Sequence, residues 1–288
     1  LNPQAKPIDL KTPNVIHYAS WIPNTPYTIA YSTVEPRETA PGWQANNDLL
    51  TVSFSSAGYI SRRNEIVPTN SGGIYGWWGC VYDWSPDGKK IAFARPDSIG
   101  LVNEKDNSLS QIINIPAYQT HGDWAWIPGI SWSPDSQILY SAIHTSSAEL
   151  TSAEESPNFD LSASLITQGT NYSLAPKAGM FSYPVTSPQL SGGSYFVAYL
   201  QAVFPEQSDN SRYRLMIMDQ DGSNKKVLFP PQGSPGIEPQ SIIWSPDPQT
   251  DHYLIAFRYQ GNLWFVDPVT SEAQQITGDG LVNQIDWK

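Results

Sequence analysis

The chain has 288 residues, of which 40% are hydrophobic, 12% aromatic and only 15% charged, and its formal net charge is −11. This composition excludes a disordered chain, because disorder needs few aromatic residues and many charges. The negative charge repels phosphate backbones and anionic lipids, so we expect no nucleic-acid partner. We also expect no membrane insertion, because no apolar run approaches the length that spans a bilayer. The 25 prolines and 20 glycines favour short strands joined by turns over long helices.

A tryptophan followed by a proline-containing turn recurs along the chain. Three copies read Trp-Ser-Pro-Asp and one reads Trp-Ile-Pro-Asn; they begin at Trp21, Trp84, Trp132 and Trp244. Ser187 marks a copy without the tryptophan, and Trp287 marks a last one. In these turns proline presets φ and aspartate bonds back to the backbone. A unit that recurs at intervals of tens of residues indicates a repeat architecture, with the marking tryptophans in its core.

Short apolar segments follow each mark. In chain order, we expect strands over 28–31, 49–54, 63–67, 91–94, 100–103, 111–115, 138–142, 161–165, 196–200, 215–218, 226–229, 254–257, 263–266 and 273–276. The segment 91–94 is apolar without alternation, which indicates burial on both faces of its sheet. Four short strands in each repeated unit are typical of a propeller blade, which is stacked between its neighbours. Insertions over 35–47, 145–159 and 205–212 account for the unequal spacing of the marks.

The sequence therefore predicts one all-β domain over residues 1–288, a β-propeller of about six four-stranded blades. Five repeats are full, and a partial blade closes the ring. Segment 5–10 resembles an outermost strand and segment 284–287 begins a sixth unit, so we expect both to join the closing blade, which leaves no open sheet edge. Either the natural chain continues past residue 288, or the ring closes on this partial blade. The start at Leu1 rather than Met is that of a trimmed or processed chain.

The turn at 84–88, followed by Lys-Lys-Ile-Ala-Phe, resembles the TolB-type (WD40-like) propeller repeat, and segment 215–223 resembles its third strand and following turn. The resemblance covers nearly the whole chain. It implies a six-bladed propeller of the kind found in envelope or secreted proteins that bind other macromolecules. Similar propellers form the non-catalytic gate of prolyl-oligopeptidase-like peptidases and, rarely, lyases that act on pectic sugars. The helical domain that precedes the propeller in TolB has no counterpart here, so its partners are not carried over.

Catalytic motifs are missing from the sequence. It contains no Gly-x-Ser-x-Gly, no His-Glu-x-x-His and no phosphate-binding glycine loop. The four histidines show no ligand spacing, and the turn at 219–223 lacks the later glutamate of a calcium loop, so we expect no metal and no cofactor. Cys80, the only cysteine, stands in an apolar stretch and is expected to be buried rather than nucleophilic.

Large aromatic residues gather where the outermost strand of one blade connects to the innermost strand of the next. The set comprises Trp77, Trp78, Trp124, Trp126, Phe181 and Tyr183. In propellers this connection lies near the mouth of the central channel, where aromatic rings stack on sugars or anchor peptides. Trp78, Trp126 and Phe181 each lie six residues before a mark of the repeat, and Glu238 lies six residues before Trp244. His121 is close in sequence to Trp124 and Trp126. Both Glu238 and His121 therefore join the predicted ligand-binding set. The alternative is that these rings wedge between blades.

These observations predict a non-catalytic, periplasmic or secreted binding or scaffold protein that recognises a protein or glycan at the channel mouth. One alternative is an enzyme, a lyase or hydrolase acting on polysaccharide, in which His121, Asp123 and Glu238 meet at the same mouth. Another is the propeller domain of a larger, peptidase-like protein. The sequence carries no signal for the oligomeric state.

Overall fold

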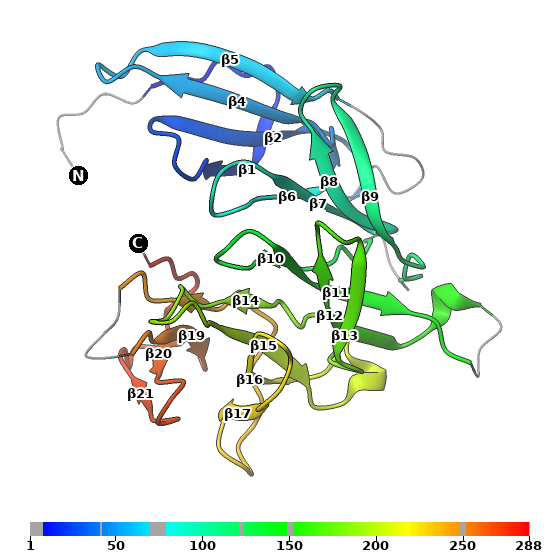
Figure 1. Cartoon of the computed structure of the whole chain (residues 1–288), viewed down its shortest axis with the longest axis vertical. Coiled ribbons are helices and arrows are strands. Elements are labelled where there is room, and N and C mark those ends of the chain that lie inside the picture. Colours follow the sequence, from blue (N-terminus) through cyan, green and yellow to red (C-terminus); the bar gives the residue numbers. More distant parts are fainter. Residues whose placement is uncertain are drawn as a thin grey trace. The chain divides into compact units, whose positions relative to one another are not determined.

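The structure, a computed structural model, describes residues 8–40, 42–69, 79–120, 124–148, 152–247 and 252–287. Within these ranges the strands form five antiparallel sheets (Figure 1). The helical elements of the same ranges are two single turns, η2 (Ala153–Glu155) and η3 (Pro205–Gln207). The prediction of an all-β propeller is confirmed.

Each sheet is one blade, and its strands pair in the order in which they occur in the chain. Blade 1 contains β1 (Val15–Trp21), β2 (Thr28–Pro36), β4 (Leu49–Phe54) and β5 (Ile60–Val67), with β3 (Trp43–Ala45) paired to β2. Blade 2 contains β6 (Val81–Trp84), β7 (Ile91–Arg95), β8 (Ser98–Asn103) and β9 (Ser108–Asn114). The predicted insertion 35–47 therefore contributes a short strand of its own.

The other three blades repeat this arrangement. Blade 3 contains β10 (Ile130–Trp132), β11 (Ile138–Thr145), β12 (Asn158–Leu165) and β13 (Thr170–Ala175). Blade 4 contains β14 (Val185–Thr186), β15 (Phe196–Ala202), β16 (Tyr213–Asp219) and β17 (Lys226–Phe229). Blade 5 contains β18 (Ile243–Trp244), β19 (Ile255–Tyr259), β20 (Asn262–Val266) and β21 (Ala273–Gln275).

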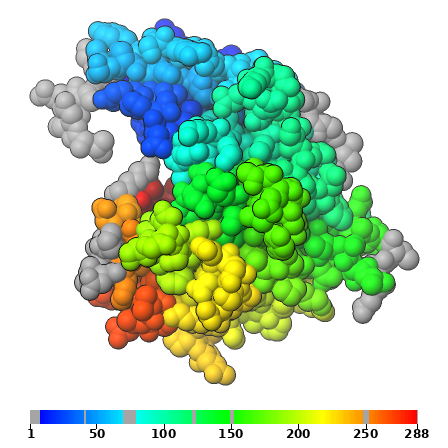
Figure 2. Space-filling view, in the orientation of Figure 1, coloured from blue at the N-terminus to red at the C-terminus, as the bar shows by residue number. Residues whose placement is uncertain are grey.

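The chain divides into two compact units, and the prediction of a single domain remains a prediction. The described residues of Leu1–Arg95, Gly100–Gln111 and Thr120–Ala125 form the first unit, and those of Pro96–Ile99, Ile112–Gln119 and Trp126–Lys288 form the second. The first unit has a core built around Leu49, Tyr82 and Phe93. Tyr213 and Phe257 belong to a core cluster of the second unit, most of which is coloured from green to red in Figure 2.

The blade count corrects the sequence analysis, because the described residues form five blades rather than about six. In the described part of the two terminal segments, 8–10 and 282–287, no residue lies in a strand. Trp287 instead stacks on Phe265 of β20, with ring centroids 4.6 Å apart. The copy of the repeat at 284–287 therefore contacts blade 5, and its described residues form no strand of their own.

Three of the marking tryptophans are buried as predicted: Trp84, Trp132 and Trp244 keep 7%, 3% and 6% of their surface exposed. Trp21 is 55% exposed, so its assignment to the core was wrong. The indole of Trp244 packs back toward the preceding blade and donates from Nε1 to the carbonyl oxygen of Val185 on β14 (3.1 Å). Trp21, on β1, opens the looser copy of the repeat, Trp-Ile-Pro-Asn.

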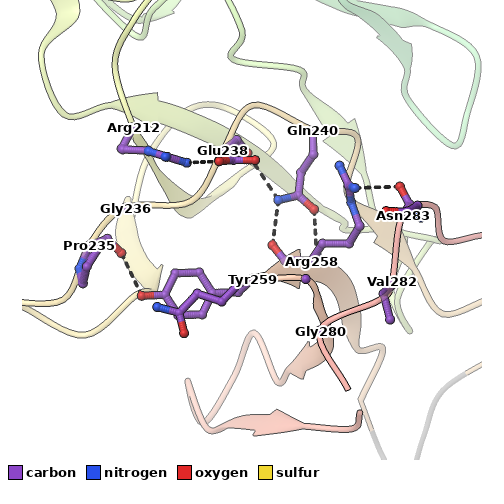
Figure 3. Close-up of a pocket in the computed structure, with 12 residues that line it drawn as sticks. Arg212, Pro235, Gly236, Glu238, Gln240, Arg258, Tyr259, Gly280, Val282 and Asn283 are labelled. Carbon is purple, nitrogen blue, oxygen red and sulfur yellow. Dashed lines mark hydrogen bonds and ion pairs between the residues drawn. The ribbon is translucent and has the colours of Figure 1, made fainter. Parts of the chain in front are cut away.

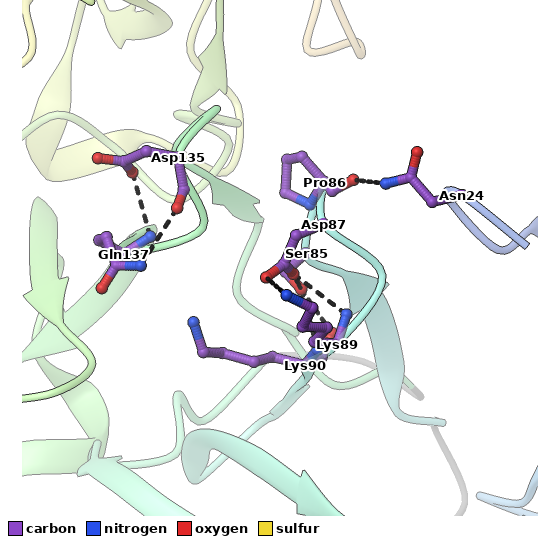
Figure 4. Close-up of polar contacts among 8 residues, drawn as sticks. All are labelled: Asn24, Ser85, Pro86, Asp87, Lys89, Lys90, Asp135 and Gln137. Atoms are coloured by element: carbon purple, nitrogen blue, oxygen red, sulfur yellow. Dashed lines mark hydrogen bonds and ion pairs between the residues drawn. The ribbon is translucent and has the colours of Figure 1, made fainter.

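The serine of the repeat explains why the turn recurs. Ser85, Ser133, Ser187 and Ser245 are buried at the end of the first strand of blades 2 to 5. Each Oγ accepts a hydrogen bond from a backbone N–H at the start of the second strand, for example from Lys90 (2.9 Å) and Leu254 (3.0 Å). Figure 4 shows this contact at Ser85 and the bond from Lys89 N to Asp87 Oδ1 (3.1 Å). The hydroxyl thus adds a hydrogen bond across the hairpin, beside the backbone bond from Ser85 N to Lys90 O (2.9 Å).

Ser133→Ala should therefore destabilise the second unit by about 1–3 kcal/mol, because it leaves the part-buried backbone N–H of Ile138 without its side-chain acceptor. Asp135→Ala is the matched control. Asp135 is exposed in the same turn, so water replaces its bonds and the cost should stay below about 1 kcal/mol. Urea denaturation followed by far-UV circular dichroism measures both. Equal losses in the two variants would contradict this role of the hydroxyl.

Candidate functional site

A pocket of about 390 Å³ lies in the second unit, between loops of blades 4 and 5 (Figure 3). Its described lining is Arg212, Pro235, Gly236, Glu238, Gln240, Arg258, Tyr259, Gln260, Gly261, Gly280, Val282 and Asn283. The lining comes from the β15–β16 and β19–β20 loops, the β17–β18 connection and the segment after β21. In antiparallel meanders these connections leave the same edge of their sheets. The pocket thus lies at the edge where the sequence predicted ligand binding.

The side chain of Gln240 links two of the segments that line the pocket. It is buried, with 7% of its surface exposed, and its amide joins the β17–β18 connection to β19. Its Nε2 donates to the carbonyl oxygens of Arg258 (2.8 Å) and Glu238 (3.2 Å), and its Oε1 accepts from Arg258 N (2.6 Å). A buried amide with these partners fixes the backbone on both sides of the pocket.

Arg258 is the charged group whose backbone Gln240 positions. Its Nη1 donates to the carbonyl oxygen of Asn283 (2.6 Å). Among the residues that the structure describes, no carboxylate lies within 4.0 Å of this guanidinium. A guanidinium has five N–H donors, so donors remain for a bound molecule.

A second arginine lies at the rim. Arg212 Nη1 and Glu238 Oε1 are 2.5 Å apart, and the two side chains are 54% and 70% exposed. Water and salt screen such an exposed pair, so it contributes little to stability and exchanges readily. Tyr259 forms a firmer wall: its hydroxyl donates to Pro235 O (3.1 Å) and its ring packs on Phe229, with centroids 4.9 Å apart.

Two glycines allow the backbone to close the base of the pocket. Val282 N donates to Gly261 O (2.8 Å), which brings the segment after β21 against the β19–β20 turn. A Cβ at Gly261 would lie 2.3 Å from the carbonyl oxygen of Gly280. Gly261 also has φ +72°, a left-handed conformation that favours glycine.

Most of the predicted aromatic set does not line this pocket. Trp126 is only 2% exposed, donates from Nε1 to Met180 O (2.9 Å) and packs on Phe159, as the wedge alternative expects. Phe181 and Tyr183 are half-buried against the core, with ring centroids 5.8 Å apart. The packing of these three rings favours the wedge alternative, and their part in ligand binding stays a prediction.

The remaining predicted residues divide into two groups. Glu238 lines the pocket and Trp124 is 39% exposed in the first unit. Trp77, Trp78, His121 and Asp123 lie outside the described residues, and so does the arrangement of His121, Asp123 and Glu238 that the enzyme alternative needs.

The aromatic pattern missed Arg212, Gln240, Arg258 and Asn283. Two of them, Arg258 and Arg212, could have been noticed because the chain has only 16 lysines and arginines. Arg258 directly follows the buried segment 255–257, and Arg212 ends the predicted insertion 205–212. Both arginines therefore lie where strands meet loops, and loops often carry function.

The smaller predictions can be checked in the described residues. Segment 219–223 is a hairpin turn, in which Gly222 N donates to Asp219 O (2.9 Å). Cys80 is buried, and burial raises the pKa of its thiol to about 11. No group of three or more histidine, cysteine, aspartate or glutamate side chains in the described ranges is arranged to hold a metal ion. The same ranges contain no helix that is long and apolar enough to cross a membrane.

One acid outside the pocket titrates unusually. Asp83 is half-buried on β6, and burial raises the pKa of its carboxyl from 3.8 to about 7, against a smaller opposite effect of the Trp84 backbone N–H. A raised pKa means that the folded chain binds a proton which the unfolded chain releases. The cost to folding is absent below pH 4, grows between pH 4 and 7, and is fully present above pH 7.

Asp83→Asn should remove this cost. We expect the variant to be more stable than the wild type at pH 8, by on the order of 2 kcal/mol, and equally stable near pH 4. Urea denaturation across this pH range measures the difference. A difference that does not change with pH would show that the carboxyl does not titrate in this window.

Comparison with known proteins identifies the fold of the chain but not its function. No protein-family model and no curated protein matches the chain. Among solved structures, a prolyl endopeptidase aligns over 92% of this chain and 36% of its own, with 13% identity and a TM-score of 0.54. TolB from Acinetobacter baumannii aligns over 92% and 55%, with 15% identity and a TM-score of 0.53. A TolB structure from Agrobacterium tumefaciens aligns over 92% and 81%, with 14% identity and a TM-score of 0.52.

These similarities confirm the resemblance to the TolB-type propeller at the level of the fold. The chain spans about a third of the peptidase and about half of Acinetobacter TolB. At such low identity one fold hosts many unrelated functions, so function has to be argued from the pocket.

Proposed function

We propose that this protein is a non-catalytic propeller that binds a protein or glycan ligand at the pocket of blades 4 and 5. The observation that carries the proposal is the clamp of Gln240 on Arg258, which positions a guanidinium at the wall of a concave site. Ligand sites are typically concave, with a few polar groups fixed by the scaffold. We further propose that the protein acts outside the cytoplasm, in the periplasm or after secretion.

The lining favours binding over chemistry. Its described side chains are guanidinium, amide, phenol and one carboxylate, Glu238, and none of them is a histidine, cysteine, serine or threonine. Hydrolysis by two carboxylates needs a second acid, and nucleophilic catalysis needs an activated hydroxyl or thiol. Guanidinium and amide groups instead form several hydrogen bonds with a polar ligand.

A glycan and peptide array probed with the 288-residue chain tests this proposal. Asn283→Trp places an indole at the pocket and removes none of the side-chain bonds described above. Val269→Trp is the matched control, because Val269 is 50% exposed and does not line the pocket. We expect a ligand that the wild type captures to lose about tenfold or more in affinity with Asn283→Trp and to be unaffected by Val269→Trp.

The same material tests the enzyme alternative. Incubation with pectic and neutral polysaccharides, followed by analysis of the products, should show no cleavage. Cleavage that Glu238→Gln abolishes would contradict the proposal and support a lyase or hydrolase. A ligand that Asn283→Trp still binds with unchanged affinity would place binding elsewhere on the chain.

A further inference from the structure

We infer that the pocket recognises a carboxylate group, with Arg258 as its anchor and the Arg212–Glu238 pair as an exchangeable contact at the rim. The inference rests on the proposed binding function and adds the chemical class of the ligand. Carboxylates are carried by sugar acids and by amino acids alike, and the experiment below separates the two sources.

The charge of the pocket is the first argument. Two guanidinium groups and one carboxylate line it, so it carries one surplus positive charge, although the chain as a whole carries −11. The surplus belongs to Arg258, which has no acidic partner among the described residues. An unpaired guanidinium in a concave site attracts an anion. One surplus charge matches a monoanion such as a carboxylate better than a phosphate dianion.

The geometry of Arg258 is the second argument. Gln240 binds both its backbone N–H and its carbonyl oxygen, and Asn283 O accepts from Nη1 (Figure 3). The guanidinium is therefore partly ordered before any ligand arrives, which lowers the entropy cost of binding. Its planar fork pairs with the two oxygens of a carboxylate through parallel hydrogen bonds.

The Arg212–Glu238 pair is the third argument, and it predicts whether a change at Glu238 strengthens or weakens ligand binding. Glu238 is a carboxylate that already binds Arg212, and it is 70% exposed. An incoming carboxylate of the same charge can take its place on Arg212. Glu238 therefore competes with the ligand, and removing its charge should strengthen binding. A ligand that used Glu238 as an acceptor would be weakened by the same change.

Titration of the isotope-labelled 288-residue chain with small molecules, followed by amide chemical shifts, tests the proposal. The probes are glucuronate as a sugar acid and N-acetylglycinate as an amino-acid carboxylate. Glucose and N-acetylglycinamide are their uncharged counterparts, and inorganic phosphate is the dianion. We expect saturable shifts at residues 236–240 and 258–261 with at least one carboxylate, no response to its uncharged counterpart, and weaker binding of phosphate.

Three variants test the roles of Arg258 and Glu238. Arg258→Gln should weaken carboxylate binding by about tenfold or more, and Arg258→Lys, which keeps the charge but not the fork, should weaken it less. Glu238→Gln should tighten binding by about threefold or more. Unchanged amide shifts away from the pocket confirm that each variant is folded.

Opposite results overturn the inference. Equal binding of a carboxylate and its uncharged counterpart, tighter binding of phosphate, or weaker binding by Glu238→Gln would each contradict it. Failure of this inference is distinct from failure of the proposed function. If an array ligand without a carboxylate loses affinity with Asn283→Trp while the small carboxylates do not bind, the binding function stands and the carboxylate inference is wrong.

Discussion

Trp84→Ala is expected to destabilise the first unit by about 3–5 kcal/mol, whereas Trp21→Ala in the same unit should cost less than about 1 kcal/mol. Both residues open a copy of the repeated turn, Trp-Ser-Pro-Asp at Trp84 and Trp-Ile-Pro-Asn at Trp21. Trp84 is 7% exposed and packs in the core with Ile91 and Phe93, so removal of its indole leaves a cavity. Trp21 is 55% exposed, so most of its ring already contacts water.

Urea denaturation followed by far-UV circular dichroism measures both variants, because the secondary-structure signal does not depend on the removed indole. The change in midpoint at constant slope gives the change in stability. A loss at Trp21 as large as that at Trp84 would mean that the exposed ring is covered in solution, either by another part of this chain or by a second molecule.

Gly261→Ala is expected to cost about 2–5 kcal/mol, and Gly280→Ala only about 1–2 kcal/mol. The two glycines have nearly the same backbone conformation, with φ +72° and +71°, so alanine pays the same conformational penalty at both. The two glycines differ in the atoms that surround them. A Cβ at Gly261 would lie 2.3 Å from Gly280 O, whereas a Cβ at Gly280 would have no atom within 4 Å.

The comparison isolates the close approach of the two backbones from the intrinsic preference for glycine. Thermal or urea unfolding of the second unit measures the stabilities. Gly261→Ala should also move the segment after β21 away from the β19–β20 turn and widen the pocket, which amide shifts at residues 280–283 would report. Equal costs in the two variants would show that the close approach is not maintained in solution.

Sequence alone predicted the blades well, because their signals are local. The turn after Trp84 depends on residues within a few positions of one another, and Ser85 closes it through neighbours in the same hairpin. Segment 49–54 was predicted as a strand and is β4 (Leu49–Phe54), since its apolar run is bounded by turn residues. Such features need no knowledge of the rest of the chain.

The errors concern contacts between units of the repeat. Trp21 and Trp132 both open a Trp-x-Pro turn, but Trp21 is 55% exposed and Trp132 only 3%. The segment at 284–287 has the sequence of a first strand, yet its described residues form no strand and Trp287 packs on Phe265. The motif alone therefore does not determine which contacts its tryptophan makes.

The pocket could not be predicted for a related reason. Arg212, Gln240 and Asn283 come from three separate loops and Arg258 from the end of β19, and none of them belongs to a shared motif. Their meeting depends on the order of strands in blades 4 and 5 and on the approach of Gly261 to Gly280. Glu238 was found because its offset from Trp244 reflects the repeat, which is the one regularity that reaches the pocket.

The single buried cysteine makes this protein convenient for site-specific labelling. At pH 7 a thiol with a pKa of about 11 is almost never a thiolate, and Cys80 is also shielded from reagents by its 8% exposure. A cysteine introduced at an exposed position should therefore react with a maleimide dye while the native residue stays untouched. Pairs of such labels, one in each unit, would report the distance between them by energy transfer without any need to replace Cys80.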